Sequence, residues 1–188
     1  FIWDSWLIMA EYVKINDFSA TNASSLSMTN IFSAEYNVYD IFIDDMDTQE
    51  LTWLKGRLID ASGNVLSNSV YDESTMELLN HVSFIDSFGV NQTAWTRLMR
   101  GSHESFAWGG MKLTIFNPFS SSDYTHAICE STAEQSGSMF GARSTFVYTA
   151  NTSCTGFQMF PAGSSPMDDI FVKVYGYKAW AVSYTHLT

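Results

Sequence analysis

Alternation of apolar and polar residues with a period of two constrains the fold of this sequence most strongly. In the segment DIFVKVYGY, at 169–177, one face of an extended chain takes Ile170, Val172 and Val174. The residues between them, such as Lys173, fall on a wetter face. The same alternation predicts further strands at 38–44, 51–60, 110–117, 124–131, 143–150 and 156–161.

Turn-forming residues separate these strands. Asp60-Ala61-Ser62-Gly63-Asn64 is the clearest hairpin signal, and serine-rich or glycine-rich turns follow at 120–122, 136–138 and 161–164. Only residues 73–81 have the three- and four-residue spacing of a helix. Many short strands with one short helix at most predict an all-β fold, an antiparallel, jelly-roll-like β-sandwich.

Size and charge narrow the possible partners. A chain of 188 residues with 46% hydrophobic residues buries one good core, so we expect a single domain. The net charge of −11 repels a phosphate backbone, which argues against nucleic acid as a partner. Every apolar stretch is interrupted before the roughly 20 residues that a membrane-spanning helix needs, so we expect no membrane insertion.

One stretch places a histidine, a cysteine and a glutamate close together. In FNPFSSSDYTHAICES, at 116–131, strand alternation sends His126 and Glu130 to one face and Cys129 to the other. We therefore expect a hairpin and not a catalytic or metal site. Cys129 and Cys154 either form one disulfide or remain two buried thiols, and the second alternative is favoured.

The densest acidic cluster comprises Asp44, Asp45, Asp47 and Glu50. Calcium binds several such oxygens, so Asp44, Asp45 and Asp47 form a weak calcium candidate. The central glycine of an EF-hand loop is absent, and carboxylates in a loop between strands are usually solvated. The four histidines share no zinc spacing, and we expect no cofactor.

The segment GSHESFAWGG, at 101–110, interrupts the strand pattern and predicts a surface loop. Phe106 and Trp108 would offer ring faces to a sugar, while His103 and Glu104 would bind its hydroxyls. The alternative is that Trp108 folds back and closes one end of the sandwich.

Neither a nucleophile elbow nor a phosphate-binding loop is present, so we expect no enzyme activity, although glycosidase carboxylates can lie on distant strands without a local motif.

Several segments resemble small β-sandwich virion proteins of tailed bacteriophages, of the tail-fibre or head-fibre kind. The resemblance covers about 9–178 and rests on MAEYVKI, YNVYDIFIDDM, WLKGRLIDASGNVLSNSVYD, IFNPFSSSDYTHAICES and CTGFQMFPAGSSPMDDIFVKVYGYK. It implies a non-enzymatic surface component of the virion, which contacts other virion proteins and forms a homo-oligomer, most simply a trimer. A receptor-binding or glycan-binding role would fit such a component.

Two other classes of protein share these features. A jelly roll also serves as a carbohydrate-binding module or a glycan-active enzyme domain. A secreted bacterial adhesin is the third alternative. Triplets for N-glycosylation at Asn22, Asn91 and Asn151 would suit a secreted glycoprotein, but about two such triplets arise by chance in a chain this rich in serine and threonine.

The two ends depart from the phage pattern. That pattern starts at Met9, so residues 1–8 are expected to be an upstream extension outside the domain at 9–179. Residues 180–188 include VSYTHLT, which resembles a translated sequencing adapter, and we expect them to add little to the core.

The loop prediction can be tested on a glycan array. If Trp108 stacks on a sugar, Trp108→Ala loses glycan binding while its melting temperature stays close to that of the wild type. Equal binding by both proteins, or binding by neither, would show that this loop is not the receptor site.

Overall fold

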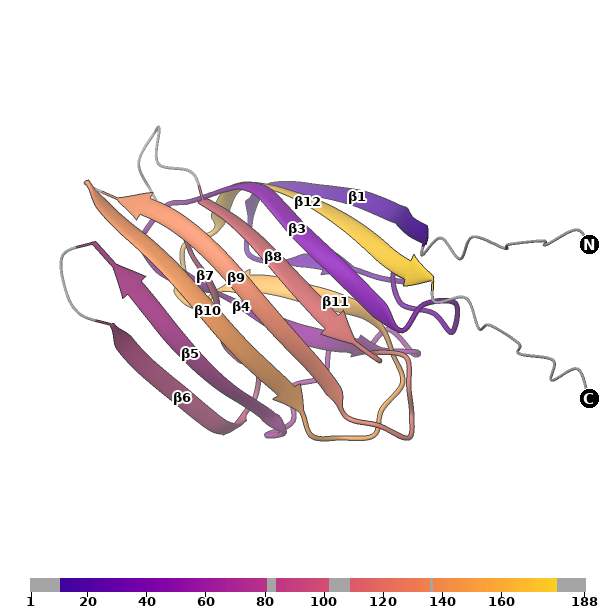
Figure 1. The fold of residues 1–188 in the computed structure, drawn as a ribbon. Coiled ribbons are helices and arrows are strands. Elements are labelled where there is room, and N and C mark those ends of the chain that lie inside the picture. Colours follow the sequence, from indigo (N-terminus) through magenta and orange to yellow (C-terminus); the bar gives the residue numbers. More distant parts are fainter. Residues whose placement is uncertain (1–10, 81–83, 102–108, 136, 179–188) are drawn as a thin grey trace, which may run out of the picture.

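The computed structural model describes residues 11–80, 84–101, 109–135 and 137–178, which form two antiparallel sheets packed face to face (Figure 1). The larger sheet has the order β1 (Glu11–Ala23), β12 (Met167–Lys178), β3 (Val38–Thr48), β8 (Gly109–Phe116), β9 (Thr125–Gln135), β10 (Ser138–Tyr148), β5 (Tyr71–Leu79), β6 (Ile85–Gln92). The smaller sheet has the order β2 (Leu26–Met28), β11 (Cys154–Pro161), β4 (Thr52–Asp60), β7 (Trp95–Gly101). No helix in these ranges is long and apolar enough to cross a membrane.

The strand order shows how the chain wraps around the sandwich. Setting aside the hairpins β5–β6 and β9–β10 leaves β1-β12-β3-β8 facing β2-β11-β4-β7. In this remainder β1 pairs with β12, β2 with β11, β3 with β8 and β4 with β7. A long hairpin rolled across two sheets gives this pairing, which is that of a jelly roll. The predicted antiparallel sandwich is confirmed, and the strand order favours the jelly-roll-like connection.

All seven strands predicted from alternation are present. In β12 the expected inner residues Ile170, Val172 and Val174 are buried, whereas Phe171 is half exposed. The predicted hairpin at 116–131 is formed by β8 and β9. The predicted turn after β4 is also present, and Gly63 has a φ of 83° there. These agreements follow from ordinary patterning, in which apolar side chains face the core.

The short helix predicted at 73–81 is wrong, because residues 71–79 form strand β5. Glu73, Thr75 and Glu77 face the interior, while Met76 and Leu78 are exposed. This strand therefore reverses the usual pattern and buries its polar side chains. Arginines on β7 compensate: Arg97 Nη1 lies 2.9 Å from Glu73 Oε1, and Arg100 Nη2 lies 3.3 Å from Glu77 Oε2.

The core lies between the sheets and is rich in aromatic residues. Trp95 of β7 packs against Tyr71, Phe146 and Phe157, with ring centroids 5.2–5.8 Å apart. These rings come from both sheets, so they join the two layers. Burial of such large rings is a main source of stability in a sandwich of this size.

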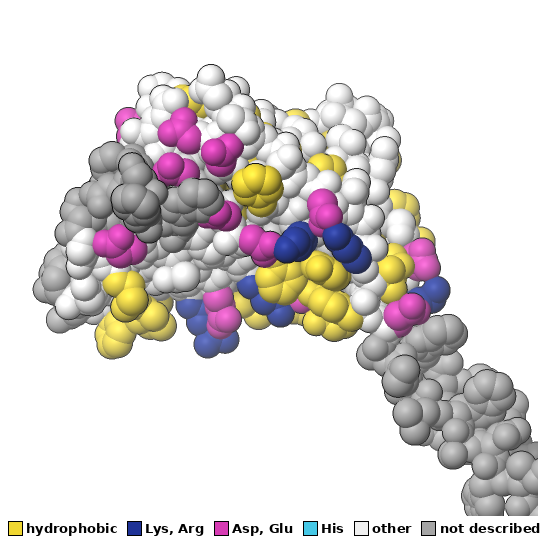
Figure 2. Space-filling view, turned by 90° about the horizontal axis from the view of Figure 1, so that it is seen from above, with side chains coloured by type: hydrophobic (Ala, Val, Ile, Leu, Met, Phe, Trp, Pro, Cys, Tyr) yellow, Lys and Arg dark blue, Asp and Glu magenta, His cyan; other side chains and the backbone are white. Residues whose placement is uncertain are grey.

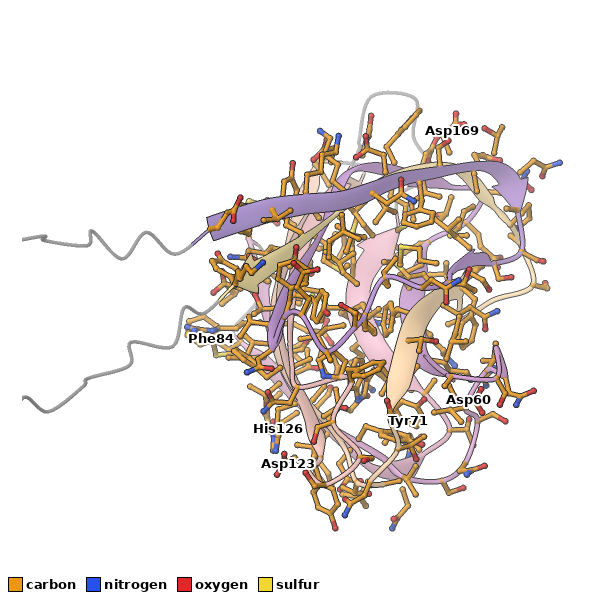
Figure 3. All side chains as sticks on the ribbon, turned by 90° about the vertical axis from the view of Figure 1, so that its right-hand side faces the viewer. Asp60, Tyr71, Phe84, Asp123, His126 and Asp169 are labelled. Atoms are coloured by element: carbon orange, nitrogen blue, oxygen red, sulfur yellow. The ribbon has the colours of Figure 1, made fainter. Side chains whose placement is uncertain are left out.

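Tyr71, which is labelled in Figure 3, also links the layers by hydrogen bonds. Its hydroxyl accepts a hydrogen bond from the backbone N–H of Leu58 at 3.0 Å and donates one to the carbonyl of Leu66 at 2.8 Å. Tyr71 belongs to β5 of the larger sheet, whereas Leu58 belongs to β4 of the smaller one. Burial raises the pKa of Tyr71 above its ordinary value, so the hydroxyl stays protonated.

Removing this hydroxyl tests the link. Tyr71→Phe keeps the ring but leaves two backbone groups without a partner, which should lower the free energy of unfolding by about 1–3 kcal/mol. Tyr124→Phe removes a hydroxyl from an exposed tyrosine and serves as the control, with an expected change within about 0.5 kcal/mol. Urea denaturation measures both. Equal stability of the two variants would contradict a structural role for the Tyr71 hydroxyl.

Candidate functional site

The loop predicted to bind sugar lies outside the described residues. Strand β7 ends at Gly101 and β8 begins at Gly109, so His103, Glu104, Phe106 and Trp108 all fall in the interval 102–108. The prediction for these four residues therefore stays a prediction.

The acidic residues proposed for calcium are not arranged as a metal site in the described part of the chain. Asp44 is ion-paired with Lys173, and Asp47 accepts a hydrogen bond from the backbone N–H of Thr48. Burial, and then the negative charges of Asp47 and Asp169, raise the pKa of Asp45 above its ordinary value. Within the described part of the chain, no three His, Cys, Asp or Glu side chains are arranged to hold a metal ion.

The histidine-cysteine-glutamate stretch is an ordinary strand, as predicted. Cys129 is buried and its thiol lies 3.2 Å from the carbonyl oxygen of Leu98, whereas His126 and Glu130 lie on the exposed face of β9 (Figure 3). Cys129 and Cys154 are separate buried thiols, which confirms the favoured alternative. Burial raises the pKa of the Cys154 thiol to about 12, so little nucleophilic thiolate forms at neutral pH.

The outer face of the larger sheet, which the smaller sheet does not cover, has a feature that the sequence did not reveal. Asp40 of β3 points to this face, yet its side chain is only 1% exposed. Its carboxylate accepts hydrogen bonds from Tyr12 and Tyr177, each at 3.2 Å, and from Thr114 at 2.5 Å. Lys112 Nζ lies 3.1 Å from the same carboxylate. Four donors on three strands, β1, β12 and β8, thus enclose one negative charge on β3.

The tyrosines around Asp40 form a row of aromatic rings, here called the tyrosine row, consisting of Tyr175, Tyr12 and Tyr177. Tyr12 is stacked on Tyr175 with centroids 4.6 Å apart, and its centroid lies 4.6 Å from that of Tyr177. Phe42 meets Tyr175 edge to face. Cross-strand pairing explains the row, because Tyr12 lies directly opposite Tyr177 in the β1–β12 ladder.

Burial and the adjacent carboxylate keep Tyr12 and Tyr177 protonated. Burial, followed by the charge of Asp40 and the hydrogen bond to it, raises the pKa of Tyr12. The same causes raise the pKa of Tyr177. Both hydroxyls therefore remain donors to Asp40 throughout the physiological pH range, which fixes the orientation of the two rings.

A shallow hollow adjoins the tyrosine row. It encloses about 360 Å³, within the range of small-molecule sites, and Asn37, Val38, Asp40, Lys112, Thr114, Tyr177 and Lys178 line it. Tyr12 and Tyr177 are both partly exposed beside it. We call the hollow and its tyrosine row the tyrosine recess.

The charges around the tyrosine recess are balanced. Four of the chain's five lysines lie on or beside it, and each is paired with an acidic side chain. These pairs are Lys14–Asp17, Lys112–Asp40, Lys173–Asp44 and Lys178–Glu35. Figure 2 shows hydrophobic and basic side chains side by side along the lower border of the body, with acidic ones next to them. A chain with a net charge of −11 therefore has a region here that is close to neutral.

The two inner glutamates of β5 are the other buried acids that could perform chemistry. Glu73 and Glu77 are four residues apart on one strand, which corresponds to about 13 Å, beyond the separation of glycosidase carboxylates. Glu73 also accepts hydrogen bonds from the backbone N–H and the hydroxyl of Thr96. Because each glutamate is also ion-paired with an arginine of β7, the geometry fits a structural link between β5 and β7.

Comparison with protein-family models, with curated proteins and with solved structures finds no match to this chain.

The enclosure of Asp40 makes a testable prediction. Asp40→Asn removes the negative charge that four donors surround, so the free energy of unfolding should fall by about 2 kcal/mol. Asp44→Asn removes a carboxylate whose ion pair with Lys173 is exposed, and should change stability by less than about 1 kcal/mol. Chemical denaturation of both variants measures the difference. A fall no larger for Asp40→Asn than for Asp44→Asn would refute the network.

Proposed function

We propose that this chain is a non-enzymatic β-sandwich domain on the surface of a phage particle, which binds a neutral glycan through the tyrosine recess. The main support for glycan binding is the row of partly exposed tyrosines beside Asp40 on the outer face. The resemblance to tail-fibre and head-fibre proteins supports the assignment to the virion and its association with other virion proteins.

Rigid aromatic rings favour a sugar as the ligand. The CH groups on one face of a pyranose pack against the exposed area of a tyrosine ring, as other apolar groups do. The hydrogen bonds of Tyr12 and Tyr177 to Asp40 hold both rings in place before a ligand arrives, so little side-chain entropy is lost on binding. Lys112, Thr114 and Asn37 line the hollow and can bind sugar hydroxyls.

Charge favours a neutral glycan over an acidic one. Each lysine near the recess already has a carboxylate partner, so a sugar acid would have to compete with Asp40 or Glu35 for it. The overall charge of −11 also repels an acidic polymer at a distance. A neutral sugar meets neither penalty.

Direct binding measurements on neutral and acidic oligosaccharides test this proposal. Tyr177→Ala removes one ring from the recess. Asn37→Ala removes a polar side chain that lines the hollow, and the structure shows no hydrogen bond from this side chain to Asp40 that the substitution would break. Loss of one ring contact should weaken binding of a neutral glycan about threefold to tenfold. Tyr124→Ala, at an exposed tyrosine in the β8–β9 connection, is the matched control and should bind like the wild type.

Three outcomes would contradict the proposal. Binding that is unchanged in both Tyr177→Ala and Asn37→Ala would place the site elsewhere. A preference for acidic glycans would refute the charge argument. Release of new reducing ends from the bound glycan would show an enzyme, the alternative that jelly-roll folds also serve.

The virion assignment needs its own test. Antibodies against the chain should label intact phage particles, and the chain should be present in their protein composition in a copy number that matches a tail or capsid symmetry. Labelling of bacterial cell surfaces in place of particles would favour the adhesin alternative.

A further inference from the structure

Strand β6 forms an unusual edge of the larger sheet. Phe88 is 77% exposed and Val90 is 58% exposed, and Phe84, just before the strand, is 73% exposed. Figure 3 shows Phe84 projecting from the outer side of the molecule. Since β6 is the last strand of its sheet, one of its sides has no strand partner among the described residues.

The other three sheet edges carry features that discourage pairing with another chain. Strand β1 has a bulge between Lys14 and Asn16 and several charged side chains. Strand β2 has only three residues, and β7 is tied to β5 by two arginine-glutamate pairs. Short, bulged or charged edges are the usual protection against edge-to-edge contact. Strand β6 has one charged residue, Asp86. Its pairing with β5 is regular from Ile85 to Gly89, and its irregularity is confined to the last residues, between Gly89 and Gln92.

The exposed apolar surface continues from β6 onto its neighbours. Met76 and Leu78 of β5 and Met139 of β10 are exposed and lie on the same outer face as Phe88. Phe84, Phe88 and Val90 lie at the edge itself, where the side chains of a paired strand would cover part of their exposed surface. The backbone groups of β6 that have no strand partner among the described residues lie along the same edge.

We propose that β6 pairs antiparallel with β6 of a second copy of this chain, with Phe88 opposite Phe88 at the centre of the contact. In that register Asp86 lies opposite Val90 of the second copy, so the only charged residue of β6 does not face its own counterpart. An antiparallel pair of identical strands is self-complementary, as a two-fold contact requires.

The ends of the described chain do not reach this edge. Strand β1, which begins it, is the opposite edge of the sheet, about 34 Å from β6 at the usual strand spacing, and β12, which ends it, lies next to β1 (Figure 1). A second copy of the chain, in contrast, has an identical apolar edge strand that can pair with this one.

The contact has a consequence for binding that rests on the proposed function. The two-fold axis of an antiparallel strand pair is perpendicular to the sheet, so both copies turn their outer faces to the same side. A dimer would thus present two tyrosine recesses in one direction, which suits bivalent attachment to a glycan-covered surface. This contact gives a dimer and not the trimer that the resemblance implies.

Molar mass in solution tests the proposal on the full chain. Sedimentation across a concentration series should give twice the 21.1 kDa of one chain for the wild type and one chain for Phe88→Glu. Phe171→Glu places the same charge on an exposed phenylalanine of β12 and should remain dimeric. Circular dichroism and melting temperature check that each variant is folded. A wild type that is monomeric or trimeric, or a Phe88→Glu variant that stays dimeric, would overturn the proposal.

Cross-linking tests the register and does not depend on glycan binding. Phe88→Cys places two thiols directly opposite each other across the contact, close enough for a disulfide. Mild oxidation should therefore give a covalent dimer of Phe88→Cys, whereas Ile128→Cys, at an exposed position of β9, should stay monomeric under denaturing conditions. Equal cross-linking of both variants, or of neither, would refute the β6 contact even if glycan binding is established.

Discussion

The two sheets differ in width, and this difference determines which surfaces of the sandwich stay open to solvent. Eight strands face four, so at the usual strand spacing the larger sheet extends well beyond its partner. The inner face of β5 is closed largely by β7, through the pairs of Glu73 with Arg97 and Glu77 with Arg100. The outer face is left to solvent and can carry a binding surface without disturbing the core.

The outer face then divides into two parts with different chemistry. At the β1–β12–β3–β8 end, polar and aromatic side chains organise around the buried carboxylate of Asp40, and the lysines there are paired with acids. At the β5–β6 end, apolar side chains such as Phe88 are exposed with few charges. The first arrangement suits recognition of a polar ligand with apolar faces, and the second suits contact with another protein surface.

Alternation predicted the strands where the buried face is apolar, but it failed for β5, because Glu73 and Glu77 are buried against arginines that lie more than twenty residues away. The tyrosine recess was missed for a related reason. Asp40, Thr114 and Tyr177 are distant in the sequence, and only strand pairing brings them together. The spacing of Tyr175 and Tyr177 predicts two aromatic rings on one face of β12. Nothing in the sequence around Asp40 indicates that this carboxylate holds the Tyr177 ring.

If a glycan binds at the tyrosine recess, an NMR titration of the labelled protein with a neutral oligosaccharide should show it. Amide shifts should change around Val38, Thr114 and Tyr177, and the Tyr12 ring signals should move with them. Shift changes that are confined to the smaller sheet, to β6 or to residues 102–108, with the recess unaffected, would contradict glycan binding at the recess.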